Sequence, residues 1–425
     1  MLARLSLVRT RSVNWWGALV TLRRDGVLYG ASALFALVLG WTSSQAAQWQ
    51  WGYLACGAYA LGAAVAFWLT RHTLAREQWV RIALLALVFF GTVAIPLGLE
   101  ARWRQLDHGV GFAQPEVSVI ERSGQALVKG QDPYHAYVTH GHLINRIVGL
   151  PAYESFFPYF PLMGVFGLPS AETHQGKGLT DARIVMSLMT LLIGLSALGL
   201  LRTSATNKIG VAQVLFTLPT GALFLATGGD DMPILALMLL ATAALQRRRS
   251  NLAGVALGLG AAMKLTAWPL ALGALLVARD ERERPAWRRV AAWTLAIVLV
   301  TVVPFVVRAP WAFMSNVFAF PLGLAGVTSP AASALPGHIL TTIWAPLGHV
   351  LAPLTILVGG YVARKYLRRH WPLELAQLLG LLSVSFAVMI CVASATRIGY
   401  LIYPLNLALW SRATIEQPVH EPVLV

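Results

Sequence analysis

Residues 82–99 read IALLALVFFGTVAIPLGL, an uninterrupted apolar stretch between Arg81 and Glu100. A helix needs about 20 predominantly apolar residues to cross the hydrocarbon core of a bilayer, and this stretch comes close to that length. It contains no charged side chain, which favours a membrane-spanning helix. We therefore predict a transmembrane helix at 82–99.

The composition extends this prediction to the whole chain. Of the 425 residues, 57% are hydrophobic and only 12% are charged, whereas a soluble domain carries about 25% charged residues. The net charge of +15 comes from short Lys/Arg clusters beside apolar runs. Because these clusters form no continuous basic face, they do not indicate a nucleic-acid partner. The sequence predicts a multi-pass protein whose main partner is the lipid bilayer.

Nine further apolar segments are long enough, or nearly so, to span a membrane. They lie at 28–44, 51–70, 183–201, 209–227, 230–246, 288–307, 345–363, 373–394 and 398–411. Two other apolar pieces, 156–170 and 252–278, fit badly as simple spans. Together these segments predict an all-α polytopic membrane protein with about 10–12 transmembrane helices.

Clusters of Lys and Arg set the predicted orientation, because such clusters stay on the cytoplasmic side of a membrane. They occur in the N-terminal segment 1–27 and beside the spans at 71–81, 247–249, 279–289 and 364–369. This pattern predicts that both termini are cytoplasmic and that the protein lies in the cell membrane. It also predicts that the long loop 100–160, with any active site it carries, is extracytoplasmic.

Between its two ends the chain is predicted to form a single transmembrane domain at 28–411, followed by a disordered cytoplasmic tail at 412–425. Basic clusters flank 252–278 on both sides, so we expect a re-entrant hairpin there, with Lys264 near its tip. The segment 311–344 is apolar but interrupted by Gly and Pro, so it cannot be one regular span. We expect it to line a substrate groove.

The acidic residues are concentrated in one part of the chain. Eight of the 18 Asp and Glu residues fall between 100 and 181. A long loop rich in titratable groups, on a protein with few others, is the best candidate for an active site. An exposed loop also collects polar residues without any function, and the composition alone does not separate these two interpretations.

Glu116 is the leading candidate for a catalytic carboxylate. Pro115 is expected to begin a helix and Gly130 to end it, which places Glu116 in the first turn. An acid at this position either acts in catalysis on a rigid helix or only stabilises the helix dipole. The helix also carries an apolar stripe suited to a membrane surface, formed by Val117, Ile120, Leu127 and Val128.

Two cations stand in strongly apolar surroundings, where a charge is costly unless it is paired or hydrated. These are Lys264 and Arg397, and we predict that they bind a phosphate. The alternatives are that Lys264 snorkels to an interface and that Arg397 is an ordinary interfacial residue. Asp230 and Asp231 stand just before Pro233 and are candidates for substrate binding, although helix capping alone would also explain them.

The sequence offers no evident metal or redox site. Cys56 and Cys391 both lie in apolar runs, which excludes a disulfide framework and a Cys-based metal site. The histidines lack the spacing of metal ligands, since His140 and His142 are separated by a single residue. We therefore predict no cofactor, and a divalent metal ion is left open.

Several motifs occur in an order that resembles a known family. The acid at 116 and its short helix are followed by Gly130-Gln131-Asp132-Pro133-Tyr134 and by Phe157-Pro158-Tyr159-Phe160-Pro161-Leu162. Further along are Gly228-Gly229-Asp230-Asp231-Met232-Pro233, the segment 253–269 around Lys264, and Arg397-Ile398-Gly399-Tyr400-Leu401-Ile402-Tyr403-Pro404. This order resembles the GT-C membrane glycosyltransferases, and most of all glycosyltransferase family 87, the polyprenyl-phosphate-mannose-dependent mannosyltransferases of actinobacteria.

The resemblance implies a GT-C fold and an inverting transfer from a lipid-phosphate sugar on the extracytoplasmic side. Glu116 matches the loop acid that is usually Asp in the family and that acts as general base. Because Glu is one methylene longer than Asp, three neighbouring acids stay open as alternative bases. They are Asp107, Glu121 and Asp132.

The sequence thus predicts an enzyme that transfers a sugar, with mannose as first choice, from a polyprenyl phosphate to an extracytoplasmic glycolipid or glycan. Lys264 and Arg397 are expected to hold the donor phosphate. The predicted substrate-binding residues are Asp230, Asp231, Tyr134, Tyr159, His338 and Tyr400. The alternatives are a transferase for arabinofuranose or another polyprenyl-linked sugar, and a transporter or flippase for a lipid-linked sugar.

Overall fold

The computed structural model describes residues 22–72, 76–107, 111–139, 142–173, 178–279, 286–327 and 330–415. These residues are predominantly helical, and the predicted all-α class is confirmed. In the part described, the only strands are β1 (Tyr137–Thr139) and β2 (His142–Ile144), which pair antiparallel with Tyr137 opposite Ile144. The first 21 residues of the predicted N-terminal segment and the tail from 416 onward lie outside the described residues.

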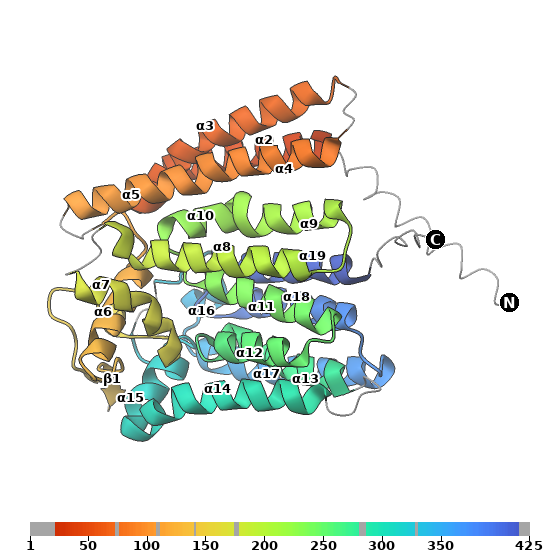
Figure 1. The fold of residues 1–425 in the computed structure, drawn as a ribbon. Helices are drawn as coiled ribbons and strands as arrows, with labels where there is room; N and C mark the ends of the chain where they lie inside the picture. The colour runs from red at the N-terminus through yellow and green to blue at the C-terminus, as the bar shows by residue number, and fades with distance from the viewer. Residues whose placement is uncertain are drawn as a thin grey trace. The chain divides into compact units, whose positions relative to one another are not determined.

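Each of the ten predicted spans falls on a helix or on a broken pair of helices (Figure 1). Six spans within the described residues are long and apolar enough to cross a membrane. They are α2 (Leu22–Thr42), α3 (Ala46–Leu69), the continuous run Glu77–Leu106 that contains α4 and α5, α8 (Ala182–Leu200), α14 (Ala286–Arg308) and α18 (Leu375–Val392). The chain is therefore a multi-pass membrane protein.

The other predicted spans are bent, shorter or less apolar. Ala205–Thr217 and Pro219–Thr227 form a pair bent by 40°, which makes a seventh span if the pair crosses as one. Among the shorter apolar helices are α11 (Asp231–Gln246) and α12 (Ser250–Ala261). The remaining helices at predicted spans are α17 (Leu347–Arg369) and α19 (Ile402–Ile415). The predicted number of about 10–12 spans includes all of these helices.

The chain divides into two compact units, of which the first holds residues up to Glu100 together with Ala205–Thr227. In this unit α2 packs along α3, and a Cβ on Gly52 would lie 2.6 Å from the backbone nitrogen of Gly40, so the two helices touch through glycine. Asp25 and Arg81 form a buried ion pair at 2.6 Å. Residues 22–27, predicted to belong to the N-terminal segment, are thus already part of helix α2.

The second unit holds Ala101–Ser204 and the chain from Gly228 onward. Its helices α8, α11, α12 and α14 lie side by side in that order (Figure 1). Small residues allow close packing here as well, because a Cβ on Gly254 would stand 2.8 Å from the carbonyl oxygen of Val290. Helix α19 packs on α18 and continues to Ile415, so the first four residues of the predicted disordered tail are helical.

The helix predicted after Pro115 is α6 (Pro115–Val128). The predicted apolar stripe is divided: Val117 and Ile120 are fully buried within the protein, whereas Val128 is exposed. The helix packs on the 3₁₀ helix η3 (Pro161–Gly167) and on α7 (Leu168–Glu172). Segment 156–170, which fitted badly as a span, is therefore the packing partner of α6.

Segments 252–278 and 311–344, both predicted to be irregular, contribute residues around the site. Within 252–278, α12 and α13 (Trp268–Arg279) are joined by a turn and the short helix η6 (Leu265–Ala267), with Lys264 just before η6. Segment 311–344 is not one regular helix, in agreement with its Gly and Pro content. It includes most of α15 (Pro310–Met314), the π-helix η7 (Ser315–Ala319) and α16 (Pro336–Ile343).

Candidate active site

Glu116 and Arg397 form a direct ion pair although 281 residues separate them in the chain. Glu116 is in the first turn of α6, and Arg397 lies between α18 and α19. The guanidinium Nη1 donates to Oε1 of Glu116 at 2.5 Å. The second carboxylate oxygen, Oε2, is buried and has no hydrogen-bond partner among the described residues. One carboxylate oxygen is thus bonded to Arg397, and the other is buried without a hydrogen-bond donor among the described residues.

Several neighbours stabilise the charge of Arg397. Burial opposes the charge, but the Glu116 carboxylate together with the hydroxyls of Tyr400 and Tyr159 raises the pKa of the guanidinium above its ordinary value. The backbone on both sides of Arg397 is held by the predicted irregular segment. Thr396 N–H donates to Ala331 O at 2.8 Å, and Ile398 N–H donates to Ser333 Oγ at 3.0 Å. Part of segment 311–344 therefore positions Arg397.

Lys264 is held by two carboxylates. Its ammonium donates to Asp230 Oδ2 at 2.6 Å and also to Asp231 Oδ1. Asp230 occupies the N-cap position of α11, but its side chain makes no capping hydrogen bond. Capping therefore does not account for this pair of acids, and snorkelling does not account for Lys264. The three side chains form a buried charged group at the start of α11.

Tyr403 and Thr266 complete the hydrogen bonding around Asp231. The Tyr403 hydroxyl donates to Asp231 Oδ1 at 2.6 Å. Because that proton is used, Thr266 Oγ1 must be the donor in its 2.6 Å contact with the Tyr403 hydroxyl. Thr266 of η6, Tyr403 of α19 and Asp231 of α11 thus form one chain of hydrogen bonds.

Tyr159 and Tyr400 connect the Glu116–Arg397 pair with the Lys264 group. The Lys264 ammonium stands 5.5 Å from the ring centroid of Tyr159. The hydroxyl of Tyr159 interacts electrostatically with Asp230 and Glu116. The hydroxyl of Tyr400 interacts in the same way with Lys264 and Arg397. The two tyrosines therefore lie within electrostatic range of both charged groups.

The backbone around Tyr159 is bonded directly to the turn that carries Lys264. Phe160 N–H donates to Met263 O at 3.0 Å, and Leu162 N–H donates to Ala262 O at 3.2 Å. These bonds fix the aromatic run against the Lys264 turn, which explains how motifs about 100 residues apart in the sequence build one site.

We call Glu116, Asp230, Asp231, Lys264 and Arg397 the charged cluster. Its three carboxylates and two cations leave one negative charge in excess. The side chains are largely buried but not sealed, with exposed fractions from 9% for Asp230 to 28% for Arg397. A polar ligand can therefore reach the cluster, and Arg397 is its most accessible member.

Gly228 stands in the turn before Asp230 and packs closely against α6, the helix that carries Glu116. It adopts a φ of +97°, and a Cβ at this position would lie 2.2 Å from Cγ2 of Val117, the neighbour of Glu116. The same Cβ would lie 3.0 Å from the Cβ of Arg183. The glycine thus lets the turn before Asp230 lie directly against α6.

We expect Gly228→Ala to lower both stability and any activity of the site. The φ value is unfavourable for alanine and the methyl group would overlap Val117, so the loss of stability should be about 1–3 kcal/mol. Thermal unfolding in detergent measures it. Gly359→Ala is the matched control, because a Cβ there meets nothing within 4 Å. Equal stability of the two variants would contradict the proposed close contact.

The three alternative acids lie in other surroundings. Glu121 is 3% exposed and pairs with Arg104 at 2.7 Å. Asp107 is exposed at the end of α5 (Ile95–Leu106). Asp132 accepts the backbone N–H of Tyr134 at 2.8 Å, and burial raises the pKa of its carboxyl. No contact in the described residues joins any of the three to Arg397 or Lys264, whereas Glu116 pairs with Arg397.

Tyr134 is buried and contacts the site through the backbone of Tyr159. It is 2% exposed, and its hydroxyl donates to the carbonyl oxygen of Tyr159 at 2.8 Å. The motif Gly130 to Tyr134 therefore supports the position of Tyr159. His338 also has a backbone partner, because its Nδ1 lies 2.8 Å from the carbonyl oxygen of Ser394, near Arg397. A substrate contact of either residue stays a prediction.

We expect Tyr134→Phe to weaken the site without unfolding the protein. The variant keeps the ring but leaves the buried Tyr159 carbonyl without its donor, a loss of about 1–3 kcal/mol. The expected result is a lower thermal midpoint together with weaker substrate binding. Tyr137→Phe is a suitable control, because Tyr137 is half-buried and lines a separate pocket that contains no residue of the charged cluster. No difference between the two variants would contradict the supporting role of Tyr134.

A buried ion network beside α6 was not predicted from the sequence. Arg104 pairs with both Glu121 and Asp181, and Asp181 also pairs with Arg183 at 3.1 Å. Asp181 is the N-cap of α8 and accepts the backbone N–H of Arg183. The sequence did contain an indication of this network, because these charged residues stand next to apolar runs, where a charge needs a partner. The network anchors α6, which carries Glu116, to α8.

No group of three or more His, Cys, Asp or Glu residues within the described ranges is arranged to hold a metal ion. Asp230 and Asp231, the adjacent acids, are both bonded to Lys264.

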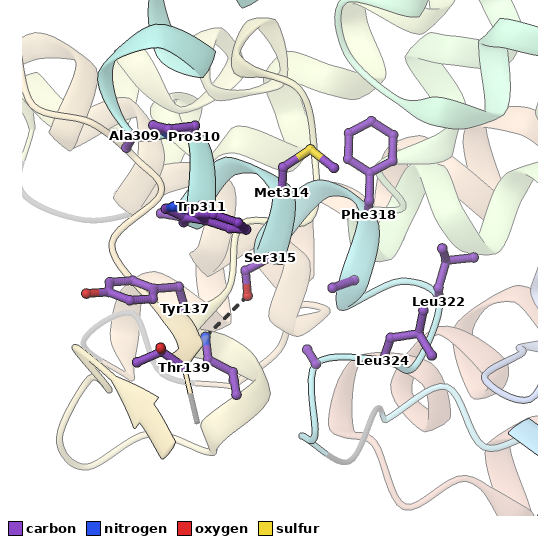
Figure 2. A pocket seen from close by; sticks show the side chains of 14 residues that line it. Tyr137, Thr139, Ala309, Pro310, Trp311, Met314, Ser315, Phe318, Leu322 and Leu324 are labelled. Atoms are coloured by element: carbon purple, nitrogen blue, oxygen red, sulfur yellow. Dashed lines mark hydrogen bonds between the residues drawn. The ribbon is translucent and has the colours of Figure 1, made fainter. Parts of the chain in front are cut away.

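An apolar pocket of about 790 Å³ lies between β1, α15 and η7 (Figure 2). Its labelled lining includes Tyr137, Trp311 and Phe318, and the dashed line in Figure 2 marks the bond from Val138 N–H to Ser315 Oγ at 3.3 Å. None of the five cluster residues lines this pocket.

Fold and site together define an all-α, multi-pass membrane protein with a partly buried charged cluster. Residues 157–394, more than half of the chain, match the model of glycosyltransferase family 87. The chain belongs to glycosyltransferase family 87, as its motifs predicted. The matched region contains Lys264 and the two aspartates, but neither Glu116 nor Arg397.

Two solved structures are similar to this chain. One is ArnT from Cupriavidus metallidurans in the apo state, with 19% identity and a TM-score of 0.46 over 83% of this chain and 60% of that chain. The other is ArnT from the same organism bound to undecaprenyl phosphate, with 18% identity and a TM-score of 0.43 over 80% and 60%. This chain thus spans about three fifths of the length of ArnT. No curated protein matches the sequence.

Proposed function

We propose that this protein is an inverting glycosyltransferase that moves a sugar from a polyprenyl phosphate to an acceptor hydroxyl. The observation that carries the proposal is the contact between Glu116 and Arg397, which brings a carboxylate and a cation together at 2.5 Å. Such a transfer needs a base for the acceptor and a cation for the departing phosphate, so the two required groups are adjacent. Membership of glycosyltransferase family 87 supports the same reaction class.

In the proposed reaction the acceptor hydroxyl oxygen attacks the anomeric carbon of the donor sugar. Its proton passes to Glu116, the new bond from oxygen to the anomeric carbon forms, and the bond from that carbon to the phosphate oxygen breaks. The electron pair of the broken bond leaves with the phosphate. Attack opposite the leaving group inverts the anomeric centre. The buried Oε2 of Glu116, which has no partner in the described residues, is suited to accept the proton.

Arg397 and Lys264 are the proposed phosphate ligands. A guanidinium binds a phosphate through two parallel N–H donors, and Arg397 is the more exposed of the two cations. The ammonium of Lys264 has three donors, of which Asp230 and Asp231 use two. Its third donor is the proposed contact to the phosphate. Tyr159 and Tyr400, which lie in range of both cations, are proposed to contact the sugar.

We further propose mannose as the sugar and an extracytoplasmic glycolipid or glycan as the acceptor. This part follows from the family resemblance and from the predicted orientation, with both termini cytoplasmic. The loop acids and α6 would then face the extracytoplasmic side, where the lipid-linked donor presents its sugar.

The test is a transfer assay with purified protein in lipid nanodiscs. Polyprenyl phosphate carrying radiolabelled mannose is supplied with a crude lipid extract as acceptor, and donors with labelled arabinofuranose and glucose run in parallel. We expect the label to move to a lipid product from the mannose donor. Transfer from a different donor would correct the sugar, and no transfer from any lipid-linked donor would overturn the proposed function.

A further inference from the structure

We propose that the donor phosphate and Glu116 compete for Arg397, so that binding of the donor frees the base that the reaction needs. This inference rests on the proposed function and concerns the order of events in the same site. It predicts that the charge of Glu116 opposes binding of the lipid phosphate, although Glu116 is required for turnover.

In the structure, Glu116 is paired with Arg397, which is the state before the donor binds in this proposal. Oε1 of Glu116 accepts from Arg397 at 2.5 Å, while Oε2 is buried and has no partner in the described part of the chain. While this contact lasts, the guanidinium holds the carboxylate in place and occupies one of its two oxygens. Glu116 and a bound phosphate therefore need the same cation.

A phosphate is a strong competitor for this guanidinium. It offers several oxygens to the planar fork of an arginine, whereas the carboxylate uses a single contact here. The side chain of Arg397 is 28% exposed and that of Glu116 is 16% exposed, so an incoming ligand meets Arg397 first. The cluster already carries one excess negative charge, and the phosphate adds another. Loss of the contact between Glu116 and Arg397 is then the expected response.

Loss of the contact with Arg397 frees Oε1 of Glu116, in addition to Oε2, which has no partner in the described residues. Both oxygens of the carboxylate are then available to an acceptor hydroxyl only after the donor phosphate has occupied Arg397.

Product release follows by the reverse exchange. After the transfer Glu116 carries the acceptor proton and is neutral, so it does not compete for Arg397. When that proton leaves, the carboxylate becomes charged and binds the guanidinium again. The polyprenyl phosphate then loses its main cation and dissociates. Ionisation of Glu116 is thereby linked to turnover at both ends of the cycle.

The test measures binding of a polyprenyl phosphate, without sugar, to the full chain in nanodiscs at neutral pH. Glu116→Gln has the same shape as the native side chain but no charge. We expect its Kd to be lower than that of the wild type by roughly five- to tenfold, the size of one ion pair set free. The double variant Glu116→Gln/Arg397→Gln should lose this gain, because the cation at issue is absent.

Glu154→Gln is the matched control. Glu154 lies within electrostatic range of Glu116 but pairs with Arg122 at 3.7 Å and makes no contact with Arg397. Its Kd should stay within about twofold of the wild type. Equal or weaker binding by Glu116→Gln, or an equal gain in Glu154→Gln, would overturn the competition. If folded wild-type protein and every variant fail to bind any polyprenyl phosphate, the proposed function itself fails.

Discussion

Glu116→Gln is expected to lower the turnover of sugar transfer by roughly 100- to 10,000-fold, the usual contribution of a positioned general base. The amide keeps the size of the side chain but cannot take the acceptor proton. The measurement is the rate of product formation at saturating donor. Thermal unfolding of the same sample serves as the folding control, and its midpoint should stay near that of the wild type.

Glu116→Asp separates the chemistry from the reach of the side chain. Aspartate is the usual residue at the matching position of the family, so this variant retains a base that is one methylene shorter. We expect it to keep more activity than Glu116→Gln, because a carboxylate is still present near Arg397. Near-normal turnover in Glu116→Gln would remove Glu116 as the base.

The second large effect is expected at Lys264. Lys264→Met removes the cation between Asp230 and Asp231 and leaves two largely buried carboxylates without their partner. Removing one side of a buried ion pair lowers the free energy of unfolding by about 3–5 kcal/mol. The expected results are a clearly lower thermal midpoint in detergent and no measurable transfer.

A compensated variant distinguishes a structural role of Lys264 from a role toward the donor. Asp230→Asn and Asp231→Asn, combined with Lys264→Met, remove all three charges and leave side chains of similar shape. We expect this triple variant to regain stability but not transfer. Recovery of transfer would show that Lys264 acts only in folding, which would contradict its assignment as a phosphate ligand.

Much of the fold could be predicted because it depends on local composition. An apolar run such as 82–99 must form a helix in a membrane, since only internal hydrogen bonds satisfy its backbone there. Lys264 and Arg397 were recognisable for a related reason, because a charge in such surroundings needs a partner. The helix after Pro115 and the break at 311–344 followed from the backbone preferences of Pro and Gly.

The pairing of these charges could not be predicted from the sequence. Nothing local indicates that Glu116 meets Arg397 across 281 residues, or that Asp230 bonds Lys264 instead of capping its own helix. The apolar stripe of α6 has the same pattern whether it faces lipid or protein, and the structure shows Val117 fully buried in protein. Long-range contacts decided each of these outcomes.

The most direct test of the central claim is the position of the phosphate in an experimental structure of the Glu116→Gln variant with bound polyprenyl phosphate. The prediction is a phosphate within hydrogen-bond distance, about 3 Å, of the Arg397 guanidinium and close to the Lys264 ammonium. The side chain at position 116 should be turned away from Arg397. A phosphate bound elsewhere, with Arg397 and Lys264 making no contact to it, would contradict the assignment of the charged cluster as the site of transfer.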